Sequence, residues 1–351
     1  MSETQTIIKT KPTLIKRLVN YVGCVVIVLS LLLNFYMILA ISTMSGSEMN
    51  QNVLKSGNED SIVAAYNIEG TINAETARDF DRFYRSTIKD EKVKAILLRV
   101  DSPGGTVSAS EQIAHQIGKL KKAGKKIVVS MGALAASGGY LISAGADHIV
   151  AEKSTITGSI GVIAQVPNCK ELMDKIGVKM QFIKSSDAKV WKDMLNPFRD
   201  TKNFEIKRMV NILNQMQQSF NQTVKQGRGD KLKLKTEIIT NISTNNSANK
   251  DIKPTENKIT ETAPLNGKIY TAIEAKNFGL IDQIGYQDAA IEQACKLIGN
   301  PNAKVIKYSF KDTAELLRSI IFGKSELPKI ATDIVESKTS AQFMMIWKPS
   351  L

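Results

Sequence analysis

Short continuous apolar runs alternate along the chain with longer stretches in which apolar residues recur every three or four positions. The continuous runs, which are typical of buried strands, lie at residues 61–68, 95–100, 127–130 and 148–151. Helical periodicity follows the first two runs, at residues 74–88 and 107–120. Because alternating strands and helices usually build a parallel sheet covered by helices, the pattern predicts an α/β fold with mostly parallel strands.

The second half of the chain is less regular. Its predicted elements are a helix at 169–176, a strand at 178–184, a long amphipathic helix at 203–225, a strand at 267–270 and helices at 272–277 and 288–297. Residues 231–263 are rich in Lys, Thr, Asn and Ser and predict a flexible insertion. The tail at residues 300–351 ends in apolar residues at 343–347, which would contact either the membrane surface or a neighbouring subunit.

Residues 18–41 form an almost unbroken apolar stretch, long enough to cross a hydrocarbon core of about 30 Å. Basic residues precede it, and residues 42–51 contain none. The positive-inside rule therefore predicts a cytoplasmic tail at 1–17, a transmembrane anchor at 18–41 and an extracytoplasmic tether at 42–60. A cleavable signal peptide is the alternative, but the apolar stretch is longer than a usual signal core, which favours an uncleaved anchor.

Composition narrows the function classes only slightly. The chain has 351 residues and a formal net charge of +13. Its basic residues are dispersed and lack interleaved aromatic residues, so the charge favours an anionic membrane surface over nucleic acid. The chain has three cysteines, two histidines and no CxxC or HExxH motif, so we predict no metal site and no cofactor. The sequence does not decide whether Cys169 and Cys295 pair.

A serine surrounded by alanine and glycine marks the candidate chemistry. The segment Met131-Gly-Ala-Leu-Ala-Ala-Ser-Gly-Gly-Tyr140 joins a predicted strand to a predicted helix and places Ser137 at the turn between them. The N–H of Gly138 would then face the group that Ser137 attacks and act as an oxyanion donor. A small-residue helix packed tightly on a strand is the alternative interpretation.

A second glycine turn, Asp101-Ser-Pro-Gly-Gly105, lies between the preceding strand and its helix. The backbone N–H of Gly105 would supply the other half of an oxyanion hole. A serine nucleophile also needs a base. The two histidines, His115 in a predicted helix and His148 at the start of a strand, do not suit a Ser-His-Asp triad, so the base has to be another residue.

The sequence resembles the S49 signal peptide peptidases of the SppA type, a family with the ClpP/crotonase-like layered fold. The resemblance covers roughly residues 62–295 and implies a peptidase domain at 61–299. Residues 161–168 resemble the SohB-type inner-membrane branch. The landmarks that carry the resemblance are the two glycine turns, Thr157-Gly-Ser-Ile-Gly-Val162, Ile183-Lys-Ser185, Lys192-Asp193, Gly227-Arg-Gly229 and Gly267-Lys-Ile-Tyr270 with Gly279-Leu-Ile-Asp282.

The resemblance implies a Ser-Lys dyad in which Ser137 is the nucleophile and a neutral lysine is the base. Counting forward from Ser137 places the base at Lys189, whereas counting back from the amphipathic helix places it at Lys192, which matches more of the pattern. Lys184 is a third candidate, expected to pack structurally. Ser159 matches the serine that hydrogen-bonds the lysine amine. Keeping a lysine neutral near pH 7 costs about 4–5 kcal/mol, so the base needs a largely desolvated site.

These features predict a membrane-anchored serine endopeptidase that degrades cleaved signal peptides and other apolar segments outside the cytoplasm, at a bacterial inner membrane. The resemblance also implies a homo-oligomer in which serine and lysine come from neighbouring subunits. A crotonase-like acyl-CoA enzyme and a non-catalytic membrane scaffold are the alternatives, and the anchor with the Ser-Lys pairing argues against the first. The sequence leaves the natural substrate and the subunit count open.

Overall fold

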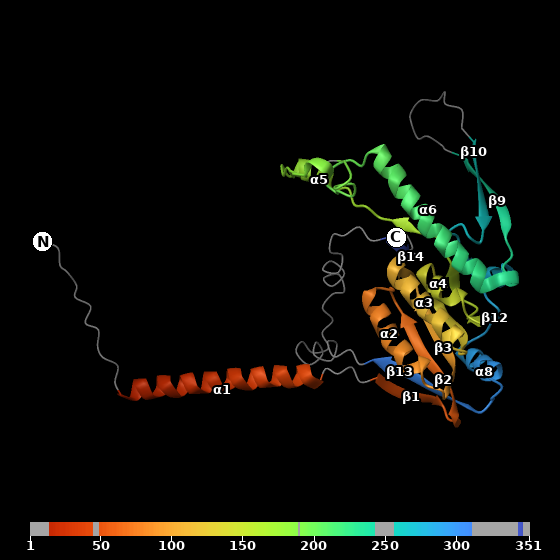
Figure 1. Cartoon of the computed structure of the whole chain (residues 1–351). Helices are drawn as coiled ribbons and strands as arrows, with labels where there is room; N and C mark the ends of the chain where they lie inside the picture. Colours follow the sequence, from red (N-terminus) through yellow and green to blue (C-terminus); the bar gives the residue numbers. More distant parts are fainter. Residues whose placement is uncertain (1–13, 45–48, 189, 243–255, 311–342, 347–351) are drawn as a thin grey trace. The chain divides into compact units, whose positions relative to one another are not determined.

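The computed structural model describes residues 14–44, 49–188, 190–242, 256–310 and 343–346 (Figure 1). The chain divides into two units, and α1 (Leu14–Met44) belongs to the first. The sheets formed by the described residues belong to the second unit, which holds residues 50–309 and 326–351.

The stretch predicted to be an anchor is helical. Helix α1 spans 31 residues, and its apolar side chains between residues 18 and 36 are exposed. Across the described ranges, the structure contains no helix with the length and apolar character that crossing a membrane requires. Anchoring by α1 stays a prediction.

A nine-stranded sheet forms the centre of the second unit. Its main order is β1 (Met49–Lys55), β13 (Ala303–Phe310), β2 (Asn58–Glu69), β3 (Val93–Ser102), β5 (Lys126–Ala136), β6 (His148–Ala151) and β12 (Gln283–Ile284). Strand β7 (Ile156–Gly158) pairs with the end of β5 and with β11 (Ile269–Thr271). All pairings from β13 to β12 are parallel, which confirms an α/β fold with a mostly parallel sheet. The ClpP/crotonase-like assignment stays a prediction.

Alternate residues of a strand point to opposite faces of the sheet, and the central strands are apolar on both faces. Helices therefore cover both faces. On one face, α8 (Gln287–Leu297) packs its small residues against β2, β3 and β5; this cluster includes Ala290, Ala294, Cys295, Val63, Leu97 and Val128. On the other face, α2 (Ala74–Ile88) packs Phe80 and Phe83 against Tyr66 of β2. Helix α3 (Val107–Lys122) lies beside α2 and also contacts α4 (Gly138–Ala144).

The long amphipathic helix is confirmed as α6 (Asn203–Arg228), and its C-terminal end is fixed to the sheet. The fully buried Arg228 guanidinium donates to Asp282 Oδ1 at 2.9 Å and to the carbonyl of Gly279 at 2.8 Å. Burial raises the pKa of Asp282, but the hydrogen bonds from Arg228 and Lys231 outweigh this effect and lower that pKa to about 2. Breaking this pair would leave a buried charge without a partner.

A small three-stranded sheet lies beside the glycine turn at residues 101–105. Strand β14 (Phe343–Ile346) lies between β4 (Gly104–Thr106) and β8 (Ile163–Ala164) and is antiparallel to both. Met345 is opposite Gly105 in this register. The sequence pattern predicts a tail at 300–351, which contains both β13 and β14. The structure instead places β13 in the central sheet.

Three further segments differ from the sequence-based prediction. The predicted tether at 42–60 contains β1 and the first residues of β2, which belong to the central sheet. Strands β9 (Lys235–Ile242) and β10 (Glu256–Ala263) pair antiparallel, so a flexible insertion over 231–263 is wrong for these residues. A hairpin satisfies its own backbone hydrogen bonds without a large core, which explains the error. The predicted strand at 178–184 is irregular and exposed, and α5 (Lys170–Lys175) precedes it. The remaining short elements are α7 (Ala272–Asn277), η1 (Ser186–Ala188) and η2 (Gly229–Lys231).

Candidate active site

Ser137 occupies the junction between β5 and α4, as predicted from the small residues around it. Its backbone has φ 53° and ψ −115°, in a region that non-glycine residues seldom adopt, and 1% of the residue is exposed. The Ser137 N–H donates to the carbonyl of Gly158 at 2.8 Å, which ties the junction to the end of β7. A strained residue held by surrounding structure is common at catalytic positions.

The two glycines predicted to form an oxyanion hole lie next to each other. A Cβ atom added to Gly138 would lie 3.2 Å from the nitrogen of Gly105 and 2.4 Å from Ser110 Oγ. A Cβ added to Gly105 would lie 1.9 Å from the carbonyl oxygen of Ile72. Both positions therefore require glycine for space, and the Gly105 nitrogen lies near Gly138, the residue that follows Ser137.

The turn after β7 lies beside Ser137. Ser137 Oγ donates to the carbonyl of Gly161 at 3.4 Å, a long contact for a hydroxyl group, so the carbonyl orients the resting hydroxyl only weakly. Ser159 lies in the same turn with φ 49° and is 8% exposed. Its N–H donates to the carbonyl of Lys268 at 2.8 Å. The structure therefore gathers Ser137, Ser159 and both glycines at one place.

The two described lysine candidates, Lys184 and Lys192, form no hydrogen bond with Ser137. Lys192 is exposed in an irregular segment before α6, and Lys189 lies outside the described residues. Lys184 Nζ donates to Asp193 Oδ1 at 2.7 Å, which gives this lysine a structural partner. Among the described residues, the hydrogen-bond partner of Ser137 Oγ is a backbone carbonyl and not an amine.

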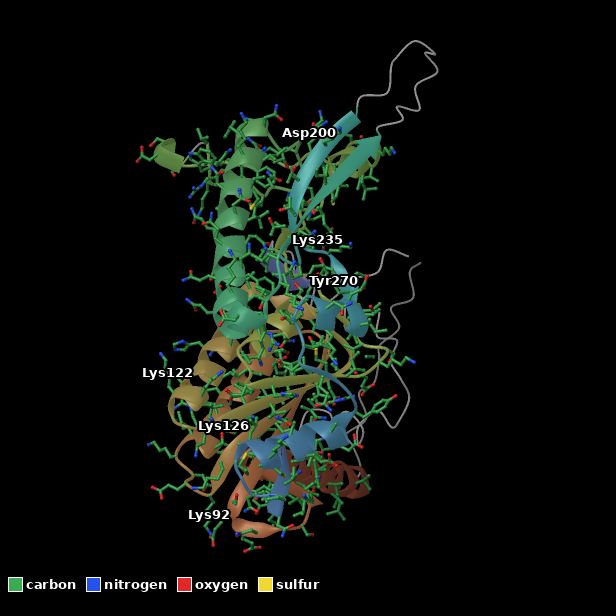
Figure 2. All side chains as sticks on the ribbon, turned by 90° about the vertical axis from the view of Figure 1, so that its right-hand side faces the viewer. Lys92, Lys122, Lys126, Asp200, Lys235 and Tyr270 are labelled. Atoms are coloured by element: carbon green, nitrogen blue, oxygen red, sulfur yellow. The ribbon has the colours of Figure 1, made fainter. Side chains whose placement is uncertain are left out.

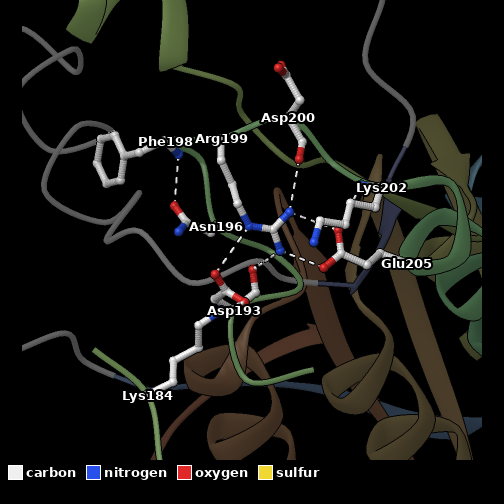
Figure 3. A network of polar contacts seen from close by, with 8 residues as sticks. All are labelled: Lys184, Asp193, Asn196, Phe198, Arg199, Asp200, Lys202 and Glu205. Atoms are coloured by element: carbon white, nitrogen blue, oxygen red, sulfur yellow. Dashed lines mark hydrogen bonds and ion pairs between the residues drawn. The ribbon is translucent and has the colours of Figure 1, made fainter. Parts of the chain in front are cut away.

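Charged residues attach the lysine-bearing segment to the first turn of α6 (Figure 3). Arg199 Nε donates to Asp193 Oδ2 at 3.2 Å, and its Nη1 donates to Glu205 Oε2 at 2.9 Å. The Glu205 side chain is 1% exposed. Hydrogen bonds from Lys184 and Arg199 hold the pKa of Asp193 well below its usual range, and the hydrogen bond from Arg199 lowers the pKa of Glu205.

Helix α6 shows how far this attachment is from the nucleophile. Gln217, further along the same helix, contacts the backbone on either side of Gly161. Residues 205 and 217 are about 18 Å apart along a helix axis. In Figure 2, Asp200, which precedes α6, lies well above Tyr270, whose ring is next to Gly158. The segment that contains Lys192 is therefore bonded to α6 at Glu205, whereas the backbone around Gly161, which contacts Ser137, is bonded to α6 at Gln217.

Sequence reasoning did not identify Gln217 or the carbonyl of Gly161 as part of the site. A signal for Gln217 was present, because this amide interrupts the apolar stripe of α6 between Leu213 and Phe220. A backbone carbonyl carries no side-chain signal at all. Within the described part of the chain, the structure places no group of three or more His, Cys, Asp or Glu where it could hold a metal ion.

The chain is similar in sequence to proteins that are named as proteases. The family model described as Peptidase family S49 matches residues 119–251 of the chain. A protein from Synechocystis sp. that is named as a protease is 33% identical over 248 residues, which cover 71% of this chain and 79% of that protein. A protein from Enterococcus faecium that is named as signal peptide peptidase SppA is 34% identical over 67% of this chain and 60% of its own length. A protein from Haemophilus influenzae that is named as protease SohB is 40% identical over 94 residues, 27% of either chain.

The matched family region includes Ser137, Ser159 and all three lysine candidates, and the Synechocystis relative is matched over most of its own length. The chain therefore belongs to peptidase family S49, and it is a peptidase.

Proposed function

We propose that this chain is a serine endopeptidase that cleaves extended, apolar peptide segments close to a membrane. One observation carries the proposal: β14, with the sequence Phe343-Met-Met-Ile346, lies antiparallel to β4 directly opposite Gly105. Peptides commonly bind by adding a strand to an exposed sheet edge. A substrate strand in the place of β14 would bring its backbone carbonyls to the Gly105 side of the predicted oxyanion hole.

The arrangement suits acyl transfer through Ser137. A base removes the hydroxyl proton, and Oγ attacks the peptide carbonyl. The N–H groups of Gly105 and Gly138 stabilise the negative charge that develops on the carbonyl oxygen. The base returns its proton to the leaving amine, and a water activated by the same base hydrolyses the acyl-enzyme. Lys192, or Lys189 as the alternative, supplies this base, and Ser159 orients its amine.

The base comes from a neighbouring copy of the chain in this proposal. Lys192 is exposed, and its segment is attached to α6 about 18 Å along the helix from the level of Gly161. The same region exposes large apolar side chains, among them Leu172, Ile176, Phe182 and Ile183, and Ile183 is 91% exposed. Exposed apolar patches of this kind mark protein contacts. A contact there would also desolvate the lysine, as its role as a base requires.

Helix α1 anchors the chain in the membrane, with the peptidase domain on the extracytoplasmic side. The supporting observations are the apolar residues at 18–41 and the basic residues that precede them. A relative named as a signal peptide peptidase suggests the substrate class. Signal peptides released within a membrane are apolar and would reach this site in extended form.

The test is Ser137→Ala in the full-length protein, with Ser154→Ala as a matched control. Ser154 is exposed in the loop between β6 and β7, so we assign its hydroxyl no part in the reaction. We expect Ser137→Ala to lose cleavage of apolar peptides and labelling by a fluorophosphonate probe, while Ser154→Ala retains both. Peptide cleavage by Ser137→Ala would refute the nucleophile. Acyl-CoA turnover without peptide cleavage would favour a crotonase-like enzyme.

A further inference from the structure

The side-chain amide of Gln217 forms a clamp on the backbone that faces the nucleophile. Its Nε2 donates to the carbonyl of Ile160 at 3.0 Å, and its Oε1 accepts from the N–H of Val162 at 3.0 Å. One amide thus binds the backbone on both sides of Gly161, as a neighbouring strand would. The second proton of Nε2 is directed to Asn221 Oδ1 at 2.9 Å, so the amide has a fixed orientation.

The clamped backbone has little room to move elsewhere. The carbonyl of Ile160 also accepts from the N–H of Gly267 at 3.0 Å. A Cβ added to Gly161 would lie 3.1 Å from the Cα of Gly267 and 3.9 Å from Gln217 Oε1. Gly161 is therefore enclosed between α6 and the turn at residue 267. Its carbonyl is the group that receives the Ser137 hydroxyl.

We propose that Gln217 is a positioning residue for Ser137. By fixing the backbone around Gly161, it holds the carbonyl on which the resting hydroxyl is oriented, and it holds the turn that presents Ser159 to the base. Gln217 touches neither the substrate nor the reacting atoms. This inference rests on the proposed function of Ser137 as the nucleophile.

The first test compares Gln217→Leu with Gln218→Leu in the full-length protein. Gln218 is the next residue of α6 and is exposed, so its substitution changes no contact with the site. We expect Gln217→Leu to lower kcat about 10- to 100-fold, as small displacements of reacting groups do, with KM changed less than about twofold. We expect Gln218→Leu to match the wild type. A kcat for Gln217→Leu within twofold of the wild type would overturn the proposal.

The second variant is Gln217→Glu, which keeps the shape of the amide. Its ionised carboxylate cannot donate to the carbonyl of Ile160, whereas its protonated form regains that donor. The rate of Ser137 labelling by a fluorophosphonate, relative to the wild type at the same pH, should therefore rise as the pH is lowered. A ratio that is constant with pH would contradict positioning through this hydrogen bond, even if Gln217→Leu fails to fold.

The outcomes separate this inference from the proposed function. If wild-type Ser137 neither labels nor supports cleavage, the nucleophile assignment fails and the role of Gln217 falls with it. If the wild type and Gln217→Leu label and cleave equally, only the role of Gln217 is refuted.

Discussion

The junction that carries Ser137 and the segment that carries Lys192 are built in opposite ways. Ser137, Gly138 and Gly105 are buried, and backbone hydrogen bonds fix their surroundings: β4 is bonded to Ile72, and Ser137 is bonded to Gly158 at the end of β7. The segment around Lys192 is irregular and exposed, and side-chain ion pairs through Asp193 and Arg199 hold it. In the proposed mechanism, one chain therefore supplies both the nucleophile and the oxyanion hole. The proposed base, in contrast, lies on a surface that a neighbouring copy would have to cover.

The sharpest way to break this comparison is to remove the base. We expect Lys192→Ala and Lys192→Arg each to lower kcat about 10²- to 10⁴-fold, because arginine cannot accept a proton. Lys189→Ala should keep substantial activity. Turnover of an apolar peptide is the measurement, and the wild-type rate should fall as the pH is lowered, since protonation removes the base. The reverse pattern would move the base to Lys189, and activity in both single variants would contradict a Ser-Lys dyad.

On the nucleophile side, the next largest effect should come from Gly105→Ala. The added methyl group would meet the carbonyl of Ile72 at 1.9 Å, so β4 has to move and its N–H leaves the oxyanion hole. We expect at least a tenfold loss of kcat, checked together with the thermal unfolding midpoint. Gly118→Ala in α3 is the matched control, because a methyl group there meets nothing within 4 Å. Full activity in Gly105→Ala would remove Gly105 from the site.

On the lysine side, Arg199→Ala should destabilise the protein by about 1–3 kcal/mol, because the buried Glu205 carboxylate loses its cationic partner and keeps only the N–H of Lys202. Chemical denaturation measures this difference. Arg208→Ala, at an exposed position of the same helix, should change stability far less. Equal stability of the two variants would show that the ion pairs do not hold this segment.

The same ion pairs give a pH dependence with a defined sign. Folding lowers the pKa of both Asp193 and Glu205, so their contribution is complete above the ordinary carboxylate pKa of about 4. It is lost as the pH falls through the lowered values. The difference in unfolding free energy between the wild type and Arg199→Ala should therefore shrink on acidification below about pH 4. A difference that stays constant on acidification would argue against this assignment.

The smallest effect concerns β14, which lies where a substrate strand would bind. Deleting residues 343–351 should raise the activity toward short apolar peptides a few-fold, because the deletion frees the edge of β4 opposite Gly105. Deleting only residues 348–351 keeps β14 and serves as the control. Equal activity of the two deletions would show that β14 does not compete with substrate.

The sequence alone predicted the features whose causes are local. Apolar runs and helical periodicity predicted the central strands and α2, α3 and α6, because a buried strand or an amphipathic helix follows from its own residues. The small residues around Ser137 predicted that it lies at a strand-to-helix turn. The glycine turns at 101–105 and 131–140 predicted Gly105 and Gly138 as oxyanion donors. The resemblance carried by these motifs pointed to family S49.

Only the tertiary structure decided the features that depend on contacts between distant parts of the chain. It placed β13 beside β2, β14 beside β4, and the amide of Gln217 on the backbone around Gly161. It also showed that the segment around Lys192 is bonded to α6 at Glu205, about three turns of helix away from Gln217, which contacts the backbone beside Ser137. No local pattern encodes such pairings, because they arise when separate elements pack together and satisfy one another's backbone hydrogen bonds.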